Sequence, residues 1–126
     1  MKIKTGFHFV INYEVYPFDL LVSINEDWDT IEKVLKRKLP SELHSGIEEG
    51  HTVGRTTMYE NQSTFIRINQ SSDPPADFLS TIQHEVFHAV DFLMERIGCE
   101  LTRSSDEAYA YMIQHITRKI YEKILV

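Results

Sequence analysis

Two histidines stand four residues apart in the segment His84-Glu85-Val86-Phe87-His88, and a glutamate follows the first of them. Residues four apart in an α-helix project from the same side, so both imidazoles can reach a single zinc ion. Glu85 points about 100° around the helix and can reach a water molecule bound to that ion. The segment therefore predicts a zinc site with His84 and His88 as metal ligands and Glu85 within reach of the bound water.

The pattern H-E-x-x-H indicates a metal site more specifically than a single histidine or glutamate does. The chain contains six histidines and twelve glutamates, so a shuffled sequence would contain this pattern with a chance of roughly 0.03. Apolar residues at intervals of three and four predict a helix over 76–97, and the two histidines lie opposite its apolar face. The metal site is therefore favoured here, whereas an exposed or satisfied histidine is the better interpretation for His8, His44 and His51.

A third protein ligand is needed, because catalytic zinc sites use three protein ligands and keep the fourth position for water. Asp91 lies about 10 Å along the helix axis from His84, so it is better placed to accept a hydrogen bond from the ring of His88, or to be solvated. The remaining candidate is Glu107, nineteen residues after His88, at the first turn of the next predicted helix.

With Glu107 included, residues 63–115 resemble the gluzincins, zinc metallopeptidases in which a glutamate on a following helix completes the H-E-x-x-H site. The sequence Asp-Glu-Ala-Tyr-Ala-Tyr over 106–111 and the short chain are similar to small metallopeptidases of phage and prophage type. The chain departs from longer gluzincins beside the ligand glutamate. Asp106 stands where they usually carry asparagine, and Ala110 or Tyr111 stands where an aspartate orients a ligand histidine.

The resemblance implies roles for five residues. His84, His88 and Glu107 would bind zinc, and Glu85 would be the general base. A tyrosine or histidine donor to the oxyanion is typical of the family. Tyr111, one turn after Glu107, is the first candidate for it, followed by Tyr109 and His115. The reaction implied is hydrolysis of a peptide bond.

Glu107 has a competing interpretation. The sequence Ser104-x-x-Glu107 is a capping box, in which the glutamate side chain accepts a hydrogen bond from the Ser104 amide at the start of a helix. One carboxylate cannot cap the helix and bind the metal together. The need for a third zinc ligand favours the metal.

The remaining patterns predict the elements that position this site. Alternating apolar residues indicate strands over 7–11 and 18–24, and Asp27 caps a helix over 28–39. A hairpin is predicted over 55–60 and 63–69, with its turn at 61–62. Loops are expected over 41–50, before the hairpin, and over 70–75, after it. A last helix begins at Ser104 or Ser105. We expect a single α+β domain over 1–126, a small, mostly antiparallel sheet packed on helices. The resemblance implies a minimal zincin-like architecture, in which the active-site helix precedes a C-terminal helix that carries a ligand.

The resemblance also implies a peptide or protein substrate that pairs with the strand before the active-site helix, over residues 65–69. Ile66 and Ile68 would face the core. Phe65, Arg67 and Asn69 would point away from it.

Charge and composition exclude other partners. The chain carries 19 acidic and 13 basic residues, a net charge of −6, so it lacks a positive field for nucleic acid. No apolar run approaches the roughly 18 residues of a membrane span, and the first residues lack the cleavage site of a signal peptide. The single cysteine, Cys99, fits a reducing compartment, so a cytoplasmic protein is expected.

Three function classes follow, in order of preference. The first is a zinc metallopeptidase. The second is a non-catalytic zinc-binding regulatory or interaction protein of phage or prophage type. The third is a metal-free protein-binding domain, in which residues 84–88 match the pattern by accident.

Overall fold

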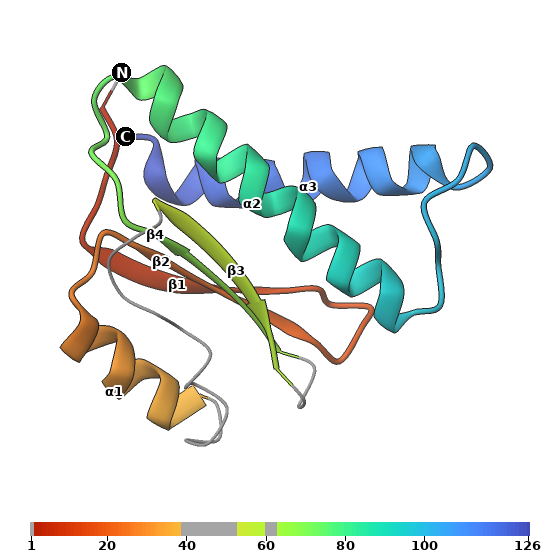
Figure 1. Ribbon diagram of the computed structural model, residues 1–126, viewed down its shortest axis with the longest axis horizontal. Helices are drawn as coiled ribbons and strands as arrows, with labels where there is room; N and C mark the ends of the chain where they lie inside the picture. Colours follow the sequence, from red (N-terminus) through yellow and green to blue (C-terminus); the bar gives the residue numbers. More distant parts are fainter. Residues whose placement is uncertain (1, 39–52, 60–62) are drawn as a thin grey trace.

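The computed structural model describes residues 2–38, 53–59 and 63–126 (Figure 1). Its elements are β1 (Phe7–Asn12), β2 (Asp19–Ile24), α1 (Trp28–Lys38), β3 (Gly54–Met58), β4 (Thr64–Ile68), α2 (Pro75–Arg96) and α3 (Asp106–Ile124). The order of strands and helices predicted from the sequence is confirmed. The loop over 41–50, the turn at 61–62 and the end of the first predicted helix at residue 39 lie outside the described residues.

The four strands form one mixed sheet in the order β1-β2-β4-β3. β1 pairs with β2 and β3 pairs with β4 in antiparallel register, whereas β2 and β4 run parallel. The sheet is therefore mostly antiparallel and the fold is α+β, as predicted.

β4 lies in the interior of the sheet, which corrects the prediction that a substrate pairs over residues 65–69. β4 is bonded to β2 on one side and to β3 on the other, so no side of its backbone is left to pair with a peptide. The physical reason is that the chain passes from β2 through α1 to β3 before it reaches β4. β4 then pairs between β2 and β3, and β3 is left on the outside. β3 and β1 are the two edge strands among the described residues.

Helices cover both faces of the sheet (Figure 1). α2 and α3 pack against one face, and the main core lies between them and the sheet; Ile66 and Ile68 belong to it, as predicted. α1 covers the other face over a smaller cluster that includes Phe65. Arg67 points away from the main core as expected, but it is buried, and its guanidinium carbon lies 5.8 Å from the centre of the Trp28 ring of α1.

The helix ends follow from local chemistry. The backbone N–H of Thr30 donates to Asp27 Oδ1 at 2.8 Å, which confirms Asp27 as the cap of α1. α2 starts with Pro75. Proline has no backbone N–H, but the N–H groups in the first turn of a helix have no partner within the helix, so no hydrogen bond is lost. After α2, Gly98 adopts a φ of +78°, a left-handed conformation that favours glycine at a helix end.

α3 runs back along α2, and two polar contacts fix the pairing. Thr117 Oγ1 donates to Gln83 Oε1 at 3.4 Å, and the Tyr121 hydroxyl donates to the Leu79 carbonyl at 3.3 Å. Both pairs align α2 and α3 in antiparallel register, with the first turn of α3 toward the end of α2 (Figure 1). None of the helices in the described ranges is both long and apolar enough to cross a membrane.

Candidate metal centre

α2 presents the two histidines of the H-E-x-x-H segment together on its exposed side. The Nε2 atoms of His84 and His88 lie 3.3 Å apart, and the two rings are inclined at 69°. Two nitrogens that bind one tetrahedral zinc at about 2.0–2.1 Å are separated by about 3.3–3.4 Å. The pair therefore has the separation of two corners of a zinc tetrahedron. The same separation also suits a weak hydrogen bond between two neutral imidazoles.

Glu85 points to the side of α2 that faces the sheet and is 6% exposed. The Thr56 hydroxyl of β3 contacts Glu85 Oε1 at 2.7 Å and the Glu85 backbone carbonyl at 3.1 Å. The other carboxylate oxygen, Oε2, lies 3.9 Å from His84 Nε2. Thr56 thus holds one oxygen of Glu85 against the strand and leaves the second on the side of the histidines.

Gly54 explains how β3 comes so close to α2. A Cβ atom at this position would lie 3.0 Å from Glu85 Cγ, 3.0 Å from Thr81 Cγ2 and 3.1 Å from Glu85 Oε2. Glycine is therefore needed for the close approach of strand and helix around the carboxylate.

The third predicted ligand, Glu107, is not brought to the histidine pair. It lies in the first turn of α3 and is exposed. Among the described residues, no group of three or more His, Cys, Asp and Glu side chains is placed to hold a metal ion. Two of the three predicted ligands are therefore assembled, with the predicted general base beside them.

The competing capping box is also not formed. α3 begins at Asp106 with Ser105 as its N-cap, and no side chain caps the helix. Ser105 Oγ instead donates to the Glu100 carbonyl and accepts from the Thr102 amide at 2.8 Å. A capping box needs a glutamate three residues after the N-cap residue. With Ser105 as the N-cap, Glu107 is only two residues after it, so the predicted box with Ser104 does not form.

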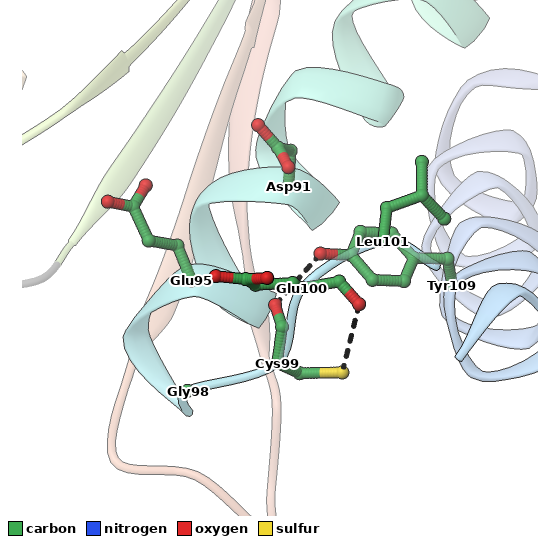
Figure 2. Close-up of a pocket in the computed structure, with 7 residues that line it drawn as sticks. All are labelled: Asp91, Glu95, Gly98, Cys99, Glu100, Leu101 and Tyr109. Atoms are coloured by element: carbon green, nitrogen blue, oxygen red, sulfur yellow. Dashed lines mark hydrogen bonds between the residues drawn. The ribbon is translucent and has the colours of Figure 1, made fainter. Parts of the chain in front are cut away.

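Two further candidates lie apart from the pair. Tyr111 is 66% exposed on α3, where it lines a shallow hollow of about 290 Å³ with Gln114, His115 and Arg118. Asp91 makes no hydrogen bond to His88 within the described part of the chain and lines a cavity farther along α2 (Figure 2).

Sequence reasoning missed Thr56 and Gly54, which position Glu85. Nothing in the H-E-x-x-H pattern identifies the strand residue that bonds to the glutamate. Gly54, immediately before a β-prone run, was the available indication, because glycine beside a strand often marks a close approach of another backbone or side chain.

No family model matches this chain, and searches of curated proteins and of solved structures found no match either.

Proposed function

We propose that this protein is a zinc-dependent metallopeptidase. The observation that carries the proposal is the 3.3 Å separation of the His84 and His88 Nε2 atoms beside the buried carboxylate of Glu85. Two imidazoles at this distance suit one zinc ion, and a neighbouring carboxylate suits the activation of water. Bound zinc would supply a Lewis acid that lowers the pKa of water and polarises a carbonyl group.

The residues of the chain divide the remaining work. His84 and His88 would hold the metal through Nε2. Glu85 accepts a proton from the attacking water through Oε2 and returns it to the leaving nitrogen of the cleaved peptide bond. Thr56 keeps the carboxylate of Glu85 in one orientation, because its hydroxyl contacts Oε1 at 2.7 Å.

Glu107 is the proposed third protein ligand and Tyr111 the proposed donor to the oxyanion. Glu107 is exposed, and in the described residues its carboxylate is engaged in neither a helix cap nor an ion pair. It is therefore free to bind a metal. Its assignment follows from the need of a catalytic zinc for three protein ligands.

β3 is the proposed docking strand for an extended peptide substrate. It is one of the two edge strands among the described residues, and its Thr56 contacts Glu85 directly. A peptide added to an edge strand gains main-chain hydrogen bonds without any requirement on its sequence. The proposal includes a cytoplasmic location, since Cys99 is a free thiol.

The proposal is tested by incubating zinc-loaded protein with a mixture of unrelated peptides and following cleavage by mass spectrometry. Glu85→Gln is the control, because the amide keeps an acceptor for Thr56 and cannot take a proton. Cleavage by the native protein that is lost in Glu85→Gln supports the proposal. Equal cleavage by both proteins contradicts it.

One observation favours the second candidate, a non-catalytic zinc-binding regulatory or interaction protein. The hydrogen bond from Thr56 to Glu85 ties α2 to β3, so Glu85 has a structural use without catalysis. Zinc binding with no cleavage of any peptide in the mixture would select this candidate.

A further inference from the structure

A cavity of about 410 Å³ opens along α2 immediately after the histidine pair. Asp91 and Glu95 line it from the helix. On a helical wheel His84, His88, Asp91 and Glu95 fall within a sector of about 60°, and Asp91 is about 4.5 Å along the axis from His88. The cavity therefore continues the exposed side of α2 that carries the candidate metal centre.

Three carboxylates line this cavity. Figure 2 shows Asp91 and Glu95 on the helix and Glu100 on the loop that follows it, with Tyr109 of α3 on the opposite side. Acidic residues therefore line the part of the cavity formed by α2 and the loop that follows it.

The carboxylates gather where the helix itself disfavours them. The C-terminal end of an α-helix carries a partial negative charge, so acidic side chains in its last turns are locally unfavourable. Asp91 and Glu95 lie in the last two turns of α2, and Glu100 follows directly. A positively charged ligand would offset this accumulation of negative charge.

The opposite wall is apolar. It is formed by Leu101, which is 51% exposed, and by the ring of Tyr109, whose hydroxyl donates to the Cys99 carbonyl at 2.9 Å (Figure 2). An apolar wall facing carboxylates suits a ligand with an aliphatic stem and a cationic end. No lysine, arginine or histidine lines the cavity among the described residues.

We infer that this cavity is a subsite for the side chain of a lysine or arginine in the peptide substrate. The inference rests on the proposed function, because the cavity adjoins the histidine pair where that function places the cleaved bond. The ammonium or guanidinium group would lie among Asp91, Glu95 and Glu100. The aliphatic stem would lie against Leu101 and Tyr109.

The test uses N-acetyl-arginine amide and its neutral isostere N-acetyl-citrulline amide, titrated into the full chain and followed by two-dimensional amide NMR. The arginine compound should shift the amide signals of residues 98–101 and bind about tenfold more tightly than the citrulline compound. Equal binding of the two compounds, or shifts confined to other parts of the chain, would overturn the inference.

A pair of matched variants places the cation. Glu95→Gln removes one charge from the last turn of α2, and Glu122→Gln removes one from the last turn of α3, outside the cavity. Glu95→Gln should weaken arginine binding about threefold, and Glu122→Gln should leave it unchanged. Equal effects of the two variants would show that only the net charge matters and would overturn the subsite.

These titrations need neither zinc nor turnover, so the two proposals can fail separately. Arginine binding at residues 98–101 by a protein that cleaves no peptide would support a cation site while overturning the peptidase. Cleavage that depends on Glu85 but shows no preference for peptides with lysine or arginine would overturn the subsite alone.

Discussion

The hydrogen bond between Thr56 and Glu85 is the contact on which the candidate site depends most. The hydroxyl lies 2.7 Å from an oxygen of a carboxylate that is 6% exposed. Replacing Thr56 by valine keeps the shape of the side chain and removes the donor. A hydrogen bond to a charged group contributes about 1.5–3 kcal/mol, and a buried acceptor left without its donor pays the cost of desolvation. We expect Thr56→Val to lower the free energy of unfolding by about 1.5–3 kcal/mol.

The measurement is urea unfolding followed by circular dichroism, with Thr57→Val as the matched control. Thr57 lies on the same strand and points to the opposite face of the sheet, so the control makes the same change in strand propensity without removing the bond to Glu85. The control should change the free energy of unfolding by less than about 0.5 kcal/mol. The reasoning is refuted if the two variants unfold at the same urea concentration.

Three further predictions concern other residues. Gly54→Ala would place a Cβ atom 3.0 Å from Glu85 Cγ, so the free energy of unfolding should fall by about 1–3 kcal/mol in urea; stability equal to the native protein would contradict the close approach. The Thr30 amide holds the pKa of Asp27 below its ordinary value, so this carboxylate stabilises the fold above its unfolded-state pKa, and that contribution is lost as the pH falls through the lower folded-state pKa. Asp27→Asn should therefore lack this acid-dependent loss in a pH series of urea titrations, and parallel pH profiles would contradict the cap. Tyr111→Phe should lower kcat by about 100-fold with little change in KM, and an unchanged kcat would remove Tyr111 as the oxyanion donor.

Local periodicity was enough to predict most of the fold. The apolar spacing over 76–97 corresponds to α2, which buries one face. The alternation over 18–24 corresponds to β2, whose Leu20, Val22 and Ile24 belong to the main core. The order of strands in the sheet was not predictable in the same way. It depends on the crossover through α1, a non-local feature that places β4 inside and β3 at the edge.

The surroundings of Glu85 also depend on a distant segment. On a helical wheel Glu85 falls about halfway between the exposed histidines and the apolar face, so the helix alone does not decide its burial. β3 decides it, because Gly54 lets the strand approach and Thr56 supplies the donor. The start of α3 shows how much one residue matters. A helix that began at Ser104 would form the predicted capping box, whereas the cap at Ser105 leaves Glu107 exposed.

The most direct test of the central claim is the zinc content of the native protein, purified without a nickel column and measured by plasma mass spectrometry. The account predicts about one zinc per chain for native protein and for Ser104→Ala, and loss of that zinc in His84→Ala, His88→Ala and Glu107→Ala. Zinc retained in Glu107→Ala alone would assign the third ligand to another residue. A native chain that takes up no zinc under conditions that saturate other zinc proteins would contradict the metal centre and the peptidase with it.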